Sequence, residues 1–315
     1  MLSTEQYIFD IKRLKAEKNA IILAHYYQTG DIQDIADFVG DSLALSQKAA
    51  SNSADIIIFA GVKFMAETAK ILAPGKKVLL PDLNAGCSLA DSCKAEDFEK
   101  FLKENQGRTV ISYVNTTAEI KALSDIICTS SNAVQIVESL PPDEKIIFAP
   151  DRNLGNYILN KTGRDMVIWN GACHVHEKFS LEAILRLKKE NSTAKIIVHP
   201  ECELPVRLVA DFIGSTSSLL KLTKKDKGNC YIIATEVGII HQMKKENPGK
   251  TYIPAPPIDS TCGCSECGFM KLITIEKILN CLKNEKPEII IDNETLIRAQ
   301  KPIQRMLEIS EKLGL

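Results

Sequence analysis

Short apolar runs alternate along the chain with longer stretches in which apolar residues recur every three or four positions. The apolar runs, such as AIILAH and DIIIFA, have the length of β-strands. Residues 63–77 show the second pattern, because Phe64, Thr68 and Ile71 fall on one helical face and Pro74 ends the helix. This alternation predicts an α/β protein whose parallel sheets are covered by helices through right-handed crossovers.

The same order of elements occurs three times. Each copy begins with an apolar strand, AIILAHYYQ, RTVISYVNTT or AKIIVHPECE. A hydroxyl-rich helix start follows, at Ser42, Ser130 and Thr216, which are 88 and 86 residues apart. A second strand comes next, DIIIFAG, KIIFAP or CYIIAT, at a similar spacing. Self-similarity at a fixed period indicates an internal repeat.

Each copy closes with a third strand and a cysteine. The strands KVLLP, MVIWN and TYIPAP are followed by Cys87, by Cys173 and by the run CGCSEC, which ends at Cys267. Cys87 and Cys173 are 86 residues apart, and Cys267 lies 94 residues further on. The Pro-rich PAPPIDS loop accommodates the excess, because loops tolerate insertions.

The repeat predicts three homologous αβα domains with parallel sheets, in a pseudo-threefold arrangement around a central active site. The predicted domains are 1–89, 90–175 and 176–315, the last with a C-terminal extension. A repeat of about 85 to 95 residues is below the commonest domain size, so we expect each of the three domains to be stabilised by packing against the others.

The repeat also predicts where ligands bind. In open parallel sheets they bind beyond the carboxyl ends of the strands, and the cysteines follow those ends. If the three ends face a common axis, Cys87, Cys173 and one cysteine of the last run converge.

Three thiolates from three domains suit a soft metal centre. An iron–sulfur cubane held by three cysteines keeps one iron free for substrate, where it acts as a Lewis acid. The alternative is that Cys87 and Cys173 are buried small hydrophobic residues, as free cysteines often are. Packing does not require a cysteine at the same place in each copy, so the repeat favours a metal.

Cys264 and Cys267 form a Cys-x-x-Cys pair, which suits a structural zinc site, a redox disulfide or one corner of a cluster. A structural zinc site needs a second local pair, and the sequence has none, which counts against zinc. The other cysteines lie in helical or strand patterns and are interpreted as core or surface thiols: Cys93, Cys128, Cys202, Cys230 and Cys281.

Polar pairs at i, i+2 end the first strands. They are His25 with Tyr27, Tyr113 with Asn115, and His199 with Glu201. In a strand this spacing places both side chains on one face, so each pair points into one cavity if its strand continues that far. Such groups support acid–base chemistry, and the alternative is an ordinary buried histidine or strand-end tyrosine. His174 and His176 are left open between ligand, acid–base group and surface.

The helix starts at Ser42, Ser130 and Thr216 offer backbone N–H groups and the positive end of the helix dipole. Ordinary N-capping explains each one alone. Three of them around one axis predict a site for a phosphorylated or carboxylated small molecule.

Composition and charge narrow the function classes. The net charge of −1 gives no attraction to nucleic acid or to acidic membranes, and 45% apolar residues are ordinary for a globular protein. We expect no membrane span, no secretion signal and a cytoplasmic protein. Ten cysteines in a large intracellular chain point to metal binding or catalysis rather than to disulfides.

Several motifs together resemble the quinolinate synthase family, the iron–sulfur enzymes of NAD biosynthesis. The resemblance covers nearly the whole chain and rests on motifs that occur in family order: AHYYQ, DSLALS, FAGVKFMAETAKIL, SYVNTTAEIKA, TSSNA, FAPDRNLG, CHVHE, HPEC, GSTSS, ATEVGIIHQM and CSECGFMKL. It implies three homologous αβα domains around a central site, in agreement with the repeat.

The resemblance implies condensation of iminoaspartate with dihydroxyacetone phosphate to quinolinate, phosphate and water. It implies a [4Fe-4S] cluster held by Cys87, Cys173 and Cys267, in which an open iron acts as a Lewis acid. Cys262 and Cys264 are then not ligands. The resemblance also implies a functional link to the enzyme that supplies iminoaspartate.

The resemblance also implies roles for the polar residues. His25 and Ser42 bind substrate carboxylate or phosphate, Tyr27 assists proton transfer, and Tyr113 with Asn115 holds the pyridine dicarboxylate. Ser130 and Thr216 complete the anion sites, together with Ser215 or Ser217. His199 and Glu201 serve in isomerisation and proton removal, with His176 nearby.

The chain departs from the common family pattern at Tyr26, Thr261 and Gly268. With Thr261 in place of a cysteine, any regulatory disulfide must involve Cys262 or Cys264 in another pairing, and we do not predict one. Two other functions are weighed: a non-enzymatic redox or iron-sensing protein, which leaves the polar strand ends unexplained, and a zinc-stabilised sugar-phosphate enzyme, which metal analysis would identify.

Overall fold

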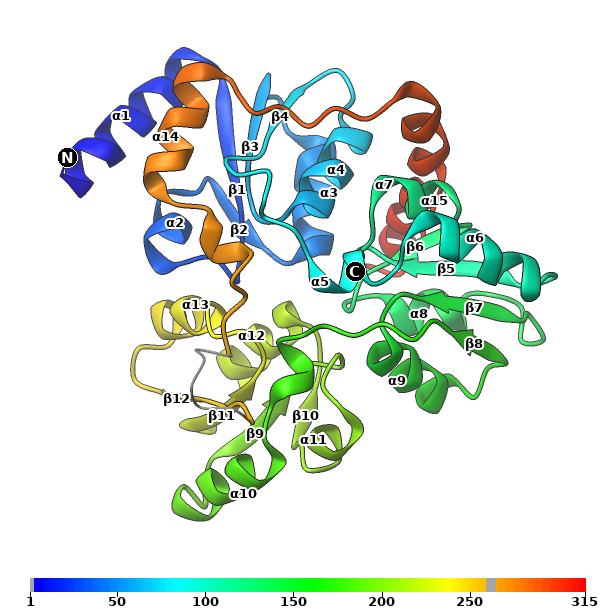
Figure 1. The fold of residues 1–315 in the computed structure, drawn as a ribbon. Helices are drawn as coiled ribbons and strands as arrows, with labels where there is room; N and C mark the ends of the chain where they lie inside the picture. Colours follow the sequence, from blue (N-terminus) through cyan, green and yellow to red (C-terminus); the bar gives the residue numbers. More distant parts are fainter. Residues whose placement is uncertain (1–2, 259–264) are drawn as a thin grey trace.

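A computed structural model of the chain describes residues 3–258 and 265–315 and contains three separate four-stranded sheets (Figure 1). The first sheet contains β1 (Ala20–His25), β2 (Phe38–Gly40), β3 (Ile56–Ala60) and β4 (Lys77–Leu79). The second contains β5 (Thr109–Tyr113), β6 (Ile126–Cys128), β7 (Ile146–Ala149) and β8 (Met166–Ile168). The third contains β9 (Lys195–Val198), β10 (Phe212–Ile213), β11 (Cys230–Ala234) and β12 (Thr251–Pro254).

All neighbouring strands in these sheets are parallel. The strand orders are β2-β1-β3-β4, β6-β5-β7-β8 and β10-β9-β11-β12, so the three sheets have the same topology. The inner strand β3 is buried along its whole length, which explains why its sequence is continuously apolar. The predicted α/β fold with three homologous parallel-sheet αβα units is confirmed.

Helices connect successive strands in the same order in each unit. They are α2 (Gly30–Ile35), α3 (Ser42–Ser51) and α4 (Lys63–Leu72), then α7 (Ala118–Ala122), α8 (Ala133–Glu138) and α9 (Arg152–Thr162), then α11 (Leu204–Leu208), α12 (Thr216–Lys225) and α13 (Ile239–Glu246). Helices α1 (Thr4–Glu17), α6 (Ala95–Glu104) and α10 (Leu181–Glu190) precede the sheets, and α5 (Ser88–Asp91) follows the first. Two 3₁₀ turns span His176–Lys178 and Met270–Leu272.

The sequence reasoning predicted three strands per repeat, and this number was wrong. Each sheet has a fourth strand, which is β2, β6 or β10 and has only two or three residues. Such a strand is too short for an alternating pattern to identify it.

Ser130 was predicted to open a helix and does not. It lies in a turn, and α8 begins at Ala133 after the N-cap Asn132. The Asn132 side chain accepts a hydrogen bond from the Thr129 backbone N–H at 2.7 Å, which closes the turn before the helix starts. Ser42 and Thr216 are the first residues of α3 and α12, as predicted.

Helices α14 (Ile275–Asn284) and α15 (Asn293–Lys312) follow the third sheet in sequence but pack elsewhere (Figure 1). Helix α14 contacts α1 and β3, and α15 contacts α4, α7, α8 and β6. One apolar core therefore joins the first two sheets with both helices, whereas the third sheet has its own apolar clusters. The limits of the predicted domains, 1–89, 90–175 and 176–315, stay a prediction.

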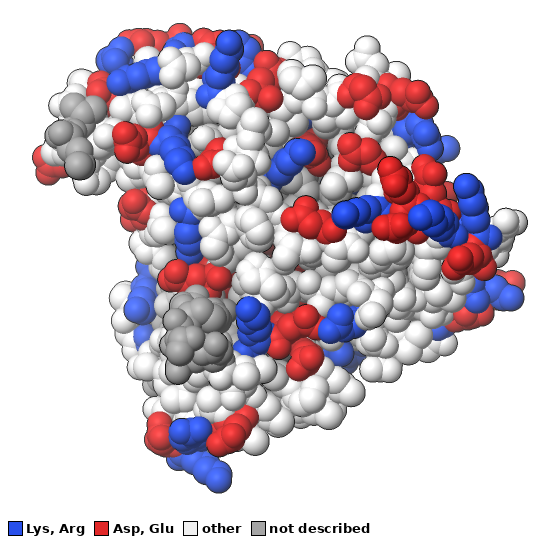
Figure 2. All heavy atoms as spheres, viewed as in Figure 1, with Lys and Arg blue, Asp and Glu red and all other residues white. Residues whose placement is uncertain are grey.

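The surface agrees with the near-zero net charge. On the face shown in Figure 2, acidic and basic side chains are interspersed, and neither sign dominates. In the part of the chain that the structure describes, none of the helices has the length and apolarity needed to cross a membrane. Attraction of an anionic ligand must therefore come from local groups.

Candidate functional site

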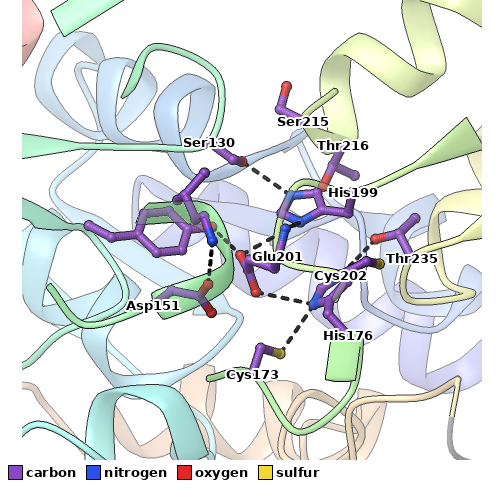
Figure 3. Close-up of polar contacts among 12 residues, drawn as sticks. Ser130, Asp151, Cys173, His176, His199, Glu201, Cys202, Ser215, Thr216 and Thr235 are labelled. Atoms are coloured by element: carbon purple, nitrogen blue, oxygen red, sulfur yellow. Dashed lines mark hydrogen bonds and ion pairs between the residues drawn. The ribbon is translucent and has the colours of Figure 1, made fainter. Parts of the chain in front are cut away.

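One cavity is lined by residues that follow the strands of all three sheets. Most of the residues predicted for the site line it: His25, Tyr27, Ser42, Cys87, Tyr113, Asn115, Ser130, Cys173, His176, His199, Glu201, Thr216 and Cys267. His174, Ser215 and Ser217 do not line it. The three units thus bring residues that are far apart in sequence to one place, as Figure 3 shows for part of the set.

Both members of each i, i+2 pair line the cavity, but they do not both lie in a strand as predicted. Strands β1 and β5 end at the first member of their pair, His25 and Tyr113, and β9 ends before His199. The second members therefore lie in the loops beyond the strands. They still face the cavity because these loops turn across the carboxyl ends of the sheets.

Each of the three cysteines lies in a loop or turn after the fourth strand of its unit, β4, β8 or β12. Cys87 precedes α5, Cys173 lies just before the 3₁₀ turn at His176, and Cys267 lies just before the turn at Met270. All three are free thiols, are partly exposed, and line the cavity.

The thiol chemistry fits a cationic cluster. Burial, with a smaller contribution from the neighbouring Cys267, raises the pKa of Cys87 to about 12. Burial likewise raises the pKa of Cys173, to which Cys87 contributes. Thiolates that repel one another across a shared space are stabilised by a bound cation, which displaces their protons. The donor set therefore fits an iron–sulfur cluster.

The remaining cysteines of the described residues do not line the cavity. Four are buried and one is partly exposed: Cys93, Cys128, Cys202, Cys281 and Cys230. Cys262, Cys264 and Thr261 lie outside the described residues.

His25 and His199 share one local arrangement. The Nδ1 atom of His25 accepts the backbone N–H of Tyr27 at 3.2 Å, and Nδ1 of His199 accepts that of Glu201 at 3.3 Å. Burial lowers the pKa of His25 to about 4 and that of His199 to about 3. Both rings are neutral at pH 7, and each presents an Nε2–H donor. The donor of His199 lies 3.2 Å from Oγ of Ser130.

Glu201 is the centre of a buried hydrogen-bond network (Figure 3). The Tyr113 hydroxyl donates to its Oε1 atom at 2.5 Å, and Nδ1 of His176 lies 3.1 Å from Oε2. Burial opposes ionisation of the carboxyl, but His176 and the hydrogen bond from Tyr113 favour it, and the pKa of Glu201 is lowered. The arrangement holds an anionic carboxylate inside the cavity.

Tyr27 lies between two threonines. Its hydroxyl is 3.0 Å from Oγ1 of Thr216 and 2.8 Å from Oγ1 of Thr235, and Thr235 is also 3.0 Å from Nε2 of His176. Burial raises the pKa of Tyr27 well above its ordinary value, so the phenol stays protonated. A proton on this hydroxyl can be shared along the chain of oxygens.

Asn115 has an unused acceptor. Its Oδ1 atom is buried and has no hydrogen-bond partner among the described residues. Because a buried acceptor without a partner costs free energy, such an atom beside a cavity indicates a bound ligand that donates to it.

Sequence reasoning missed the residues that follow the second strands of the repeat. Val62, Asp151 and Glu236 each lie two positions after the corresponding alanine, at Ala60, Ala149 and Ala234. Val62 and Glu236 line the cavity. The i, i+2 reasoning used for the first strands would have found Glu236 if it had been applied to the second strands.

Glu236, which follows β11, forms hydrogen bonds and an ion pair with the segment around Cys267. Its side chain is fully buried, accepts the backbone N–H of Gly238 at 2.7 Å and that of Cys267 at 3.2 Å, and lies 2.8 Å from Nζ of Lys271. Lys271 also donates to the carbonyl of Tyr27 at 2.6 Å. This ion pair connects one predicted cluster ligand with the loop that carries Tyr27.

Comparisons with known proteins agree with this site. The family described as "Quinolinate synthetase A protein" matches residues 9–308. The chain is 59% identical to quinolinate synthase of Thermosynechococcus vestitus over 300 residues, which cover 95% of this chain and 94% of that protein. It is also 59% identical to quinolinate synthase of Microcystis aeruginosa, with the same coverage, and to that of Synechocystis sp..

Proposed function

Since the chain belongs to the quinolinate synthase family, the enzymes that make quinolinate for NAD biosynthesis, we propose that it condenses iminoaspartate with dihydroxyacetone phosphate to quinolinate, phosphate and water. The observation that supports this most strongly is the single cavity to which all three units contribute both a cysteine and polar side chains. A reaction between two small anionic substrates needs such an enclosed and polar site.

The proposed cofactor is a [4Fe-4S] cluster held by Cys87, Cys173 and Cys267. When bound, it would supply a Lewis-acidic iron that polarises an oxygen leaving group. The three thiols, one from each unit, line the same cavity.

Substrate carboxylates and phosphate are proposed to bind to neutral donors. His25 and His199 each keep a proton on Nε2, and the hydroxyls of Ser42, Ser130 and Thr216 line the same cavity. Neutral donors bind an anion without an uncompensated positive charge being buried when the site is empty.

Tyr113 and Asn115 are proposed to hold the dicarboxylate of the product. The free Oδ1 of Asn115 can accept a hydrogen bond from a substrate N–H or O–H group. The Tyr113 hydroxyl donates to Glu201, so it also fixes the carboxylate relative to the bound molecule.

Glu201, His199, His176 and Tyr27 are proposed as the proton-transfer groups. Glu201 is anionic and buried, so it can take a proton from a substrate carbon during isomerisation. Tyr27 stays protonated and can return a proton through its hydroxyl.

The iminoaspartate is proposed to come from an enzyme that oxidises an amino acid, because an imine in water hydrolyses and must be used soon after it forms.

Single replacement of Cys87, Cys173 and Cys267 by serine tests the proposal, with Cys262→Ser and Cys264→Ser as controls. We expect the first three variants to lose iron and quinolinate formation, and the two controls to keep both. Quinolinate formation by a Cys87→Ser enzyme that holds no iron would refute the role of the cluster.

A further inference from the structure

Three side chains that line the cavity are placed so that they could hold one metal ion. Cys173, His176 and Glu201 each offer one ligand atom, and these atoms all lie within 4.8 Å of one another. Nδ1 of His176 is 3.2 Å from Sγ of Cys173 and 3.1 Å from Oε2 of Glu201. Figure 3 shows that the sulfur and the carboxylate approach the same nitrogen of the His176 ring.

We propose that the chain without its iron–sulfur cluster binds one Zn²⁺ ion through Cys173, His176 and Glu201. Zinc takes sulfur, nitrogen and oxygen ligands in tetrahedral sites, and three protein ligands leave a fourth position for water. That position would face the cavity that the three residues line. The site belongs to the cluster-free chain and shares one residue, Cys173, with the three-cysteine set.

The distances suit this ion. Zinc bonds of about 2.0–2.3 Å in a tetrahedron place neighbouring ligand atoms roughly 3.3–3.6 Å apart. The two contacts of His176, 3.2 Å to Cys173 and 3.1 Å to Glu201, need to lengthen by roughly a few tenths of an ångström. The sulfur and the carboxylate oxygen lie within 4.8 Å of each other and need to settle at a similar separation. A thiolate and a carboxylate also balance the double positive charge, and a mixed sulfur, nitrogen and oxygen set favours zinc over calcium or magnesium.

The atoms that would not bind the metal already have partners that orient the ligands. Nε2 of His176 is 3.0 Å from Oγ1 of Thr235, which fixes the ring with Nδ1 toward the ion. The Tyr113 hydroxyl holds Oε1 of Glu201 at 2.5 Å and leaves Oε2 free. Hydrogen bonds of this kind behind the ligands are the usual support of a zinc site.

The consequence is competition between two metals. Cys173 belongs to both sets, whereas Cys87 and Cys267 belong only to the proposed cluster. A chain that holds zinc therefore lacks one of the three thiolates that the cluster needs. This consequence rests on the proposed function, but zinc binding itself does not.

The test uses the full-length chain, purified without oxygen and stripped of iron, with Cys262→Ser and Cys264→Ser to remove other thiols of the last run. Zinc affinity is measured by competition with a coloured chelator, and Co²⁺ is used as a spectroscopic probe of a four-coordinate thiolate site. We expect one zinc per chain. His176→Ala and Glu201→Gln should each weaken binding roughly 100-fold or more, because each removes a ligand.

Two further variants separate this site from the cluster cysteines. Cys87→Ser and Cys267→Ser should bind zinc as the parent does, although neither can hold the cluster. Thr235→Val keeps all three ligands and should weaken zinc binding roughly 10-fold through loss of the orienting hydrogen bond. Circular dichroism checks that each variant is folded.

Zinc affinity that survives in His176→Ala, or that is lost in Cys87→Ser, would overturn the proposal, because either result places the ion on the three cysteines or elsewhere. Addition of zinc before cluster reconstitution should also reduce iron uptake by the parent chain. The same zinc should have little effect on iron uptake by His176→Ala. Failure to make quinolinate would not bear on these results, because none of them requires substrate.

Discussion

Replacement of Lys271 by methionine should destabilise the protein more than any comparable change on its surface. Lys271 lies 2.8 Å from Glu236, whose side chain is fully buried, and only 20% of the Lys271 side chain is exposed. Removal of the ammonium leaves a buried carboxylate with only the N–H groups of Gly238 and Cys267 as partners.

The size of the effect follows from these contacts. Loss of one partner of a buried ion pair costs about 3–5 kcal/mol. We expect the lower end, about 3 kcal/mol, because two backbone N–H groups still bond to the carboxylate of Glu236. In the double variant Lys271→Met with Glu236→Gln no charge is buried, so about 2 kcal/mol of coupling between the two sites should appear.

Urea unfolding of the cluster-free chain measures these values for the parent, the two single variants and the double variant. Lys100→Met is the matched control, because Lys100 is 70% exposed and pairs with Asp97 on one turn of α6. This control should change the free energy of unfolding by no more than about 0.5 kcal/mol. Additive single effects, with a coupling below about 0.5 kcal/mol, would refute the assignment of Glu236 and Lys271 as a buried pair.

Three further changes test other parts of the structure. Tyr113→Phe removes a hydrogen bond to a carboxylate worth about 1.5–3 kcal/mol, so kcat should fall at least roughly tenfold while iron content stays unchanged; an unaltered kcat contradicts the proposed role. Folding lowers the pKa of His25 to about 4 and that of His199 to about 3, so the protein should lose stability as the pH falls below about 6.5. The loss in the free energy of unfolding should reach up to about 1.4 kcal/mol per pH unit for each ring. Urea titrations should show a smaller loss when either histidine is replaced by glutamine. Ile303→Ala in α15 should cost about 2–5 kcal/mol in unfolding experiments, whereas the exposed Ile297→Ala on the same helix should cost less than about 0.5 kcal/mol.

The repeat made most of the fold and the site predictable. Equivalent positions in three copies carry the same local information, so the ends of three strands could be identified without knowledge of how the units pack. The family assignment from motifs is confirmed, and it decides against a non-enzymatic iron sensor. The roles of individual residues and the type of cluster stay predictions.

What the sequence did not reveal depends on geometry. Strand β10 has two residues, and it forms only because β9 offers a free edge beside it. Ser130 looks like a helix start, but Asn132 three positions after Thr129 closes a turn first. The Glu236–Lys271 pair joins residues 35 positions apart whose approach no spacing rule predicts.

Helix α15 is synthesised after all three sheets but packs against elements of the first two units. Its Ser310 accepts a hydrogen bond from Asn132, 178 residues earlier, and its apolar face covers α4, α7 and β6. During translation the first two units leave the ribosome well before this helix exists, so apolar surface on both stays uncovered until the third unit has been synthesised. Chaperones that shield such surface should therefore engage the nascent chain over that interval, and the cavity can be completed only afterwards.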